Sequence, residues 1–131
     1  YNISSSNVAS GIKSLGLLQM LVHSRQVTNK TILILDEPEV NLHPKWQIEY
    51  AKIIIELVVL GANIIVTTHS PYILEALKLF SDRSALDSNF YLVKKNQSLS
   101  HFFDVTNNVG MAFGELSEPL IDLNKEVDDD F

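Results

Sequence analysis

The first 80 residues alternate between two patterns of hydrophobic positions. Apolar residues recur at spacings of three and four after Ser10 and again after Pro44, which predicts two amphipathic helices. Residues 31–35 and 63–67 are continuous β-favouring runs, typical of parallel strands with helices covering both faces. Ser70 is a predicted N-cap for a third helix. The order helix, strand, helix, strand, helix predicts an α/β fold built on a parallel sheet.

The last third of the chain has a different pattern. Residues 90–93 and 99–103 are short apolar runs on either side of a polar segment, which predicts a C-terminal β-hairpin. After Val105 most residues are polar, and an acidic run occupies residues 128–130. We therefore predict an irregular acidic tail over about residues 106–131.

Composition narrows the classes of protein that fit this chain. It has 131 residues, of which 46% are hydrophobic, so it can fold around a core. A net charge of −6 disfavours charge-driven binding to an anionic membrane or to nucleic acid, although a local basic groove would still permit the latter. The chain has no cysteine, which excludes disulfides and fits a reducing compartment, so we expect a cytoplasmic protein. No apolar run approaches the roughly 20 residues of a membrane span.

Two adjacent carboxylates follow the first predicted strand. Asp36 and Glu37 come directly after residues 31–35, and Pro38 ends the strand. Ligands bind at the carboxyl ends of strands in open α/β sheets. There, Asp36 could hold Mg²⁺ through its oxygens, and Glu37 could orient or deprotonate a water that attacks a phosphate. A solvated turn would give the same three residues, so this motif alone leaves both interpretations open.

Two further features fit a phosphate-binding site. His69 follows the second predicted strand and is therefore expected at the same sheet edge as Asp36 and Glu37, where a neutral imidazole could hydrogen-bond a terminal phosphate. Ser10 and Gly11 open the first predicted helix, whose free N–H groups and dipole favour phosphate. Taken alone, a histidine before a helix is more often a capping or packing residue, and a serine at a helix start is more often an ordinary N-cap.

A transition-metal site is an alternative interpretation of the acidic segment. Four side chains of ligand type fall within eight residues: Asp36, Glu37, Glu39 and His43. Direct metal chemistry by Asp36, Glu37 and His69 would make the chain a metal-dependent hydrolase. The spacing fits no helical pair of ligands, and no second histidine lies nearby. We therefore do not expect a zinc site here.

Taken in order, these features resemble the C-terminal half of an ATP-binding-cassette-type ATPase domain. Four segments carry the resemblance: residues 9–13 (Ala-Ser-Gly-Ile-Lys) resemble the signature motif, residues 32–37 Walker B, residues 38–44 the D-loop region, and His69 the switch histidine. The resemblance covers about residues 7–80.

The residue sequences of two segments are similar to those of one group within this family. Residues 36–44 read Asp-Glu-Pro-Glu-Val-Asn-Leu-His-Pro, and residues 68–71 read Thr-His-Ser-Pro. Both resemble the AAA-type ATPases of the overcoming-lysogenization-defect group, relatives of the structural-maintenance-of-chromosomes and DNA-repair ATPases. Two positions depart from the wider pattern: Ile12 replaces a usual signature glycine, and His43 replaces the aspartate of transporter-type D-loops. The histidine is normal for the group named.

The resemblance implies a site for ATP and Mg²⁺. By resemblance, Asp36 serves the Mg²⁺ site, Glu37 is the catalytic base and His69 contacts the γ-phosphate. Ser10 and Gly11 would contact the nucleotide bound by the opposite protomer of a head-to-tail homodimer.

The 131 residues contain no G-x-x-x-x-G-K-[ST] loop, which would cradle the β-phosphate and supply a neutralising lysine. In the family that the chain resembles, this Walker A loop precedes the signature motif. We therefore expect one partial ATPase domain over residues 1–131, a P-loop NTPase-like lobe without its Walker A part and inactive by itself. The expected function is ATP hydrolysis by the intact protein. The alternative is a truncated or degenerate domain that serves in assembly, and an upstream Walker A motif would favour hydrolysis.

Overall fold

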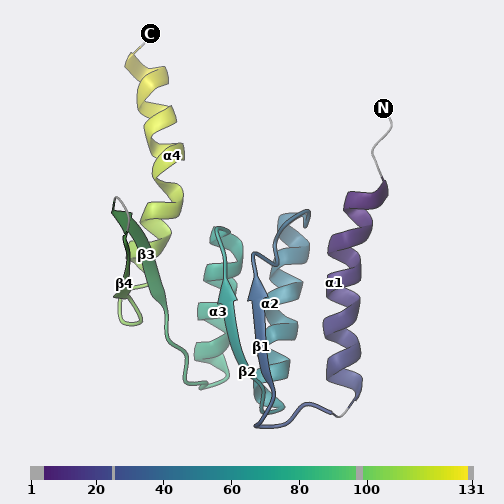
Figure 1. The fold of residues 1–131 in the computed structure, drawn as a ribbon. Helices are drawn as coiled ribbons and strands as arrows, with labels where there is room; N and C mark the ends of the chain where they lie inside the picture. Colours follow the sequence, from purple (N-terminus) through teal and green to yellow (C-terminus); the bar gives the residue numbers. More distant parts are fainter. Residues whose placement is uncertain (1–4, 25, 97–98, 130–131) are drawn as a thin grey trace. The chain divides into compact units, whose positions relative to one another are not determined.

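The computed structural model describes residues 5–24, 26–96 and 99–129. The chain divides into two compact units, Tyr1–Leu86 and Asp87–Phe131, and each is described by itself (Figure 1). The elements of the first unit follow the predicted order: α1 (Ser5–Ser24), β1 (Ile32–Asp36), α2 (Pro44–Val59), β2 (Asn63–Thr67) and α3 (Pro71–Arg83). The prediction of an α/β arrangement is thus confirmed for this unit, whereas a single partial ATPase domain over the whole chain stays a prediction.

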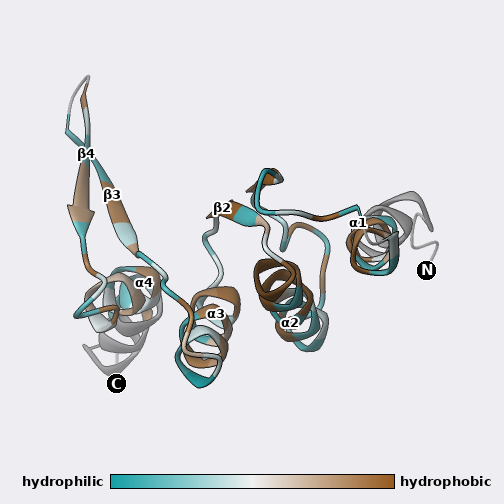
Figure 2. Cartoon of the chain, turned by 90° about the horizontal axis from the view of Figure 1, so that it is seen from below, coloured by the Kyte–Doolittle hydropathy of each residue, from teal (hydrophilic) through white to brown (hydrophobic). Residues whose placement is uncertain are grey.

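The two strands of the first unit are parallel neighbours. Ile32 lies opposite Asn63 at one end of the pair, and Asp36 lies opposite Thr67 at the other. Helices α2 and α3 lie on the same side of the strands (Figure 2). The carboxyl ends of β1 and β2 therefore meet at one edge, as predicted.

The two faces of this sheet differ in burial. Alternate residues of both strands are partly buried against the helices, whereas Ile32, Ile34 and Ile65 are exposed on the other face. The prediction of helices on both faces is not met among the described residues, because the two helices that follow the strands share one face. The continuous apolar runs arise because large apolar residues also occupy the exposed face.

Helix α1 begins earlier than the sequence predicts. It starts at Ser5, so Ser10 lies inside the helix and is not its N-cap, and Gly11 is likewise helical. The 3–4 spacing of apolar residues extends back through Val8, four positions before Ile12, which favours the longer helix.

Helix α2 begins at the predicted position. Pro44 occupies its first turn, and the His43 side chain caps the helix because Nδ1 accepts from the Lys45 amide at 3.3 Å. Beyond the C-cap at Leu60, Gly61 has a φ of 108°. A Cβ at Gly61 would also meet the Asn29 backbone nitrogen at 3.2 Å, so both conformation and space favour glycine there.

The core of the first unit lies between α1, α2 and the covered face of the sheet. Tyr50 and Leu57 of α2 are almost completely buried, and they cluster with Leu15 and Leu18 of α1. The Tyr50 hydroxyl lies 2.9 Å from Ser14 Oγ. Burial raises the pKa of Tyr50 above its usual range, and the hydrogen bond with Ser14 partly opposes this shift.

Leu57→Ala should lower the free energy of unfolding by about 3 kcal/mol, because it removes a fully buried side chain and leaves a cavity. Urea unfolding followed by circular dichroism measures this change. Val59→Ala is the matched control, since Val59 lies in the same helix and is largely exposed. Equal losses from the two variants would contradict the position of the core.

The second unit contains the predicted hairpin. Strands β3 (Tyr91–Asn96) and β4 (Leu99–Asp104) pair antiparallel, with Val93 opposite Phe102. The Thr106 amide donates to Asp104 and lowers the pKa of that exposed carboxyl. Each strand extends beyond the predicted apolar runs.

Helix α4 (Gly110–Asp129) occupies most of the segment for which we predicted an irregular acidic tail. Val109 and Ala112 are buried and Leu116 is partly buried, so spacings of three and four place apolar residues on one face. Because most residues of this segment are polar, its composition alone does not indicate a helix. Pro119 lies within the helix and removes one backbone donor. Among the described residues, no helix combines the length and apolar character needed to cross a membrane.

Candidate functional site

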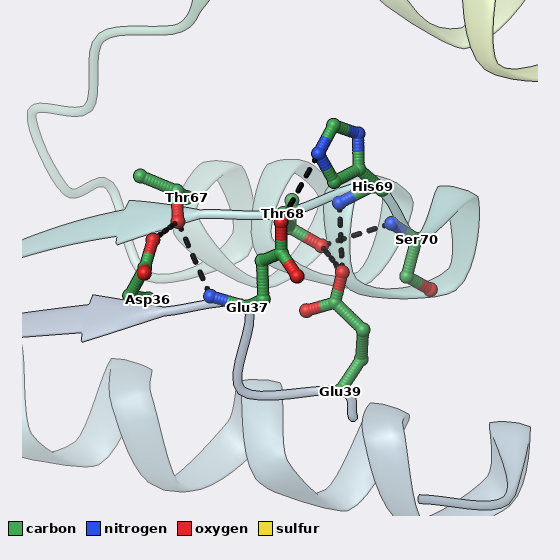
Figure 3. Close-up of polar contacts among 7 residues, drawn as sticks. All are labelled: Asp36, Glu37, Glu39, Thr67, Thr68, His69 and Ser70. Carbon is green, nitrogen blue, oxygen red and sulfur yellow. Dashed lines mark hydrogen bonds and ion pairs between the residues drawn. The ribbon is translucent and has the colours of Figure 1, made fainter. Parts of the chain in front are cut away.

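The carboxyl edge of the parallel strands brings three predicted site residues together. Asp36 ends β1, Glu37 follows it, and His69 lies two residues beyond the end of β2 (Figure 3). Because Asp36 is the register partner of Thr67, the two segments leave the sheet side by side. The predicted grouping of Asp36, Glu37 and His69 is therefore present in the structure.

Thr67 holds the end of β1 in place. Its hydroxyl donates to Asp36 Oδ1 and accepts from the Glu37 amide at 3.2 Å. The Glu37 amide also donates to the Thr67 carbonyl at 3.0 Å. One threonine thus fixes the Asp36 carboxylate and the backbone that carries Glu37.

Glu37 occupies a left-handed backbone conformation, with a φ of 44°. This conformation costs a non-glycine residue roughly 1–2 kcal/mol, and such strain is concentrated at functional sites. Here it starts the turn in which the Val40 amide donates to the Glu37 carbonyl at 3.2 Å. The strand therefore ends sharply, directly before the segment that contains Glu39.

The Glu37 carboxylate and the His69 imidazole face each other. Glu37 Oε1 lies 3.2 Å from His69 Nε2, and the two side chains are 48% and 81% exposed (Figure 3). The contact is a hydrogen bond when Nε2 carries a proton, and an ion pair when the imidazole is charged. Both groups are open to solvent, so a ligand could reach them.

Glu39 makes a second link between the two loops. Its Oε1 accepts from the Thr68 hydroxyl at 2.8 Å and from the His69 amide at 2.7 Å. The Thr68 hydroxyl oxygen in turn accepts from the Ser70 amide at 3.0 Å. The loop after β1 therefore holds the loop after β2 directly before α3.

Ser70 is the N-cap of α3, as predicted. Its hydroxyl oxygen accepts from the amides of Tyr72 and Ile73, and the hydroxyl donates to Gln47 Oε1 in α2. Gln47 Nε2 donates to the Leu42 carbonyl at 2.9 Å. Both Ser70 and Gln47 are buried, so this link lies inside the unit.

The other predicted site residues, Ser10 and Gly11, do not belong to the loops at this sheet edge. Ser10 and Gly11 are in α1, and their side-chain surroundings lie outside the described part of the chain. Their contact with a nucleotide therefore stays a prediction. Within the described ranges, no group of three or more His, Asp and Glu side chains is arranged to hold a metal ion. His43 instead serves as the cap of α2.

Asp36 suits Mg²⁺ bound mainly by phosphate oxygens and water. Its carboxylate is exposed at the sheet edge, and one of its two oxygens accepts from Thr67. Mg²⁺ keeps several waters and commonly takes only one or two protein carboxylates when it binds together with a phosphate substrate. The donor chemistry at Asp36 therefore fits this ion.

Sequence reasoning missed three residues of the site. Thr67 carries a weak signal, since it is a polar residue at the end of the second predicted strand. The sequence indicates Glu39 only as a candidate metal ligand. Gln47 carries the clearest signal, because it lies three residues before Tyr50 on the apolar face of α2, and a buried amide must find hydrogen-bond partners.

A known protein family matches the part of the chain that contains all the residues of this edge. A family described as "AAA domain, putative AbiEii toxin, Type IV TA system" matches residues 1–75, more than half of the chain. No curated protein and no solved structure matches the chain. The matched region contains Asp36, Glu37 and His69 at the carboxyl edge of its parallel strands. The chain therefore belongs to this family of AAA domains, which is a family of P-loop ATPases.

Proposed function

We propose that this edge is the hydrolytic half of an ATPase site. The observation that carries the proposal is the contact of 3.2 Å between Glu37 Oε1 and His69 Nε2, beside the exposed carboxylate of Asp36. A carboxylate at this position accepts a proton from the attacking water, and the imidazole hydrogen-bonds the terminal phosphate. Membership of the AAA family supports ATP as the substrate.

In this proposal, Asp36 holds Mg²⁺ on the nucleotide. The ion, when bound, neutralises charge on the phosphates. Thr67 keeps the Asp36 carboxylate at the sheet edge through its hydroxyl. The Walker A loop is expected from another part of the natural full-length protein.

The finer assignment is also a proposal. The segment from Asp36 to Pro44 resembles the overcoming-lysogenization-defect group, and Ser10 and Gly11 resemble part of a signature motif. On this basis, two protomers bind head to tail, and each Ser10-Gly11 pair faces the nucleotide held by the partner. A non-catalytic assembly role is the alternative outcome.

Asp36→Asn in the full-length protein should weaken ATP binding at least about tenfold in the presence of Mg²⁺, because the amide loses the charge that attracts the ion. Affinity for ATP measured with EDTA should change much less. Titration calorimetry with and without Mg²⁺ gives both values. Asp82→Asn is the matched control, since Asp82 pairs with Lys78 on the surface of α3. Equal weakening in both conditions would argue against a Mg²⁺ role for Asp36.

The proposal as a whole is tested by ATPase activity of the full-length wild type. Mg²⁺-dependent release of phosphate is expected. Tight ATP binding without hydrolysis would instead favour the assembly role.

A further inference from the structure

A partly buried carboxylate joins the two loops that carry the candidate catalytic groups. Glu39 lies two residues after Glu37, and its Oε1 accepts from the His69 amide at 2.7 Å and the Thr68 hydroxyl at 2.8 Å (Figure 3). Hydrogen bonds to an ionised acceptor are stronger than those between neutral groups. Glu39 therefore restrains the backbone that carries the His69 imidazole.

The contact of Glu39 belongs to a closed ring of hydrogen bonds. The Leu42 amide donates to the Glu39 carbonyl at 2.9 Å, and the Leu42 carbonyl accepts from Gln47. Gln47 accepts from the Ser70 hydroxyl, and the Ser70 amide donates to Thr68 Oγ1, which completes the ring at Glu39. The loop after β1, the start of α2 and the N-terminus of α3 are thus held as one assembly.

The His69 imidazole has little support of its own. Its side chain is 81% exposed, and its ion-pair partner is Glu37. An exposed ring of this kind samples several rotamers about its own side-chain bonds, and the position of the backbone decides which of them can reach Glu37. The distance between His69 and Glu37 therefore depends on the restraint at the His69 amide.

Glu39 is not explained by stability alone. Its second oxygen, Oε2, is buried and has no hydrogen-bond partner among the described residues. A buried acceptor without a partner is costly, and such a group in a folded protein calls for an explanation. A role in placing His69 provides one.

We propose that Glu39 is a positioning residue for the candidate ATPase site: its carboxylate couples the loop that begins at Glu37 to the backbone of His69. This inference rests on the proposed function of that edge. Movement of the 37–43 loop is then transmitted to the backbone amide of His69 through the Glu39 carboxylate. Glu39 need not touch the nucleotide.

The test is a double-mutant cycle in the natural full-length protein. Glu39→Ala should lower kcat for ATP hydrolysis at least about tenfold, with KM for ATP within about threefold of wild type, because the placement of His69 is lost. In the His69→Ala background, Glu39→Ala should cause no further loss, because the group that it positions is already absent. Glu39→Gln keeps an acceptor oxygen and should retain kcat within about threefold.

A direct readout of the contact accompanies the kinetics. Hydrogen exchange at the His69 amide, followed by NMR, should accelerate at least about tenfold in Glu39→Ala. Glu49→Ala is the matched control: its carboxylate pairs with Lys52 on α2, and its removal should change neither kcat nor the exchange. If Glu39→Ala does not fold, Glu39→Asp replaces it, since its shorter side chain cannot reach both donors and should lower kcat similarly.

The outcomes separate the two proposals. A wild type that neither binds nor hydrolyses ATP would overturn the proposed function, whatever the exchange at His69 shows. An active wild type whose kcat is unchanged by Glu39→Ala, or by Glu39→Asp where Ala does not fold, would overturn the positioning role alone. Full additivity with His69→Ala would do the same.

Discussion

Glu37→Gln in the natural full-length protein should lower kcat for ATP hydrolysis at least about 100-fold, while the affinity for ATP stays within about threefold. The amide has nearly the shape of the carboxylate but cannot accept a proton from the attacking water, and loss of a general base typically costs 10²–10⁴ in rate. An amide can still hydrogen-bond His69 Nε2, so the contact of 3.2 Å need not be lost. Single-turnover hydrolysis at saturating ATP, beside calorimetric ATP binding, measures the two quantities.

Glu49→Gln is the control for this experiment. Glu49 is a half-exposed carboxylate on α2 that pairs with Lys52, and the change to glutamine is chemically identical. It should leave both hydrolysis and binding unchanged. Near-normal turnover by Glu37→Gln with ATP fully bound would mean that Glu37 is not the base, and the proposed chemistry would need another acceptor.

The arrangement of the strands could be predicted because it depends on short-range patterns. The apolar runs, together with Pro44, Ser70 and Gly61 at the helix ends, indicate the two strands and helices α2 and α3 of the first unit, whereas the start of α1 lies five residues before the predicted position. Parallel pairing then places the carboxyl ends of β1 and β2 at one edge. The convergence of Asp36, Glu37 and His69 follows from these two steps alone.

The contacts that organise this edge could not be predicted in the same way. Glu39 and His69 are 30 residues apart, and no spacing rule shows that a carboxylate from one loop will accept the backbone amide of another. The link from Gln47 to Ser70 depends on how closely α2 and α3 pack. These bonds are a consequence of tertiary packing, whereas periodicity reports only the face of an element.

The errors at the ends of the chain have a compositional cause. The residues before Ser10 and after Val105 are mostly polar, yet helix α1 begins at Ser5 and helix α4 spans Gly110–Asp129. Polar residues do not exclude a helix whose few apolar positions keep spacings of three and four, as Val109, Ala112 and Leu116 do. The exposed face of the sheet at Ile34 shows that an apolar pattern can also mislead. The strand is continuously apolar, yet among the described residues only one of its faces is covered.

Because Ser10 lies inside α1 and does not cap it, a substitution at this position can test the predicted two-protomer site without removing a helix cap. Aspartate and serine have similar helix propensities, so Ser10→Asp should preserve the fold whether or not the residue meets a nucleotide. If Ser10 faces the phosphates of ATP held by the partner, the new carboxylate opposes like charge in a partly desolvated interface. That repulsion costs several kcal/mol, on the order of 3 or more, which is enough to prevent closure.

We therefore expect Ser10→Asp to retain ATP binding and to abolish ATP-dependent dimerisation and hydrolysis of the full-length protein. Light scattering with ATP in a Glu37→Gln background measures the dimer without turnover, and a thermal melt verifies the fold. Ser10→Asn is the matched control, because it has almost the volume of aspartate without its charge and should dimerise far better. A normal ATP-dependent dimer from the Ser10→Asp, Glu37→Gln double variant would show that Ser10 does not face the nucleotide. It would also remove the main support for the head-to-tail site. The proposed roles of Glu37 and His69 would not be affected, because separate assays test them.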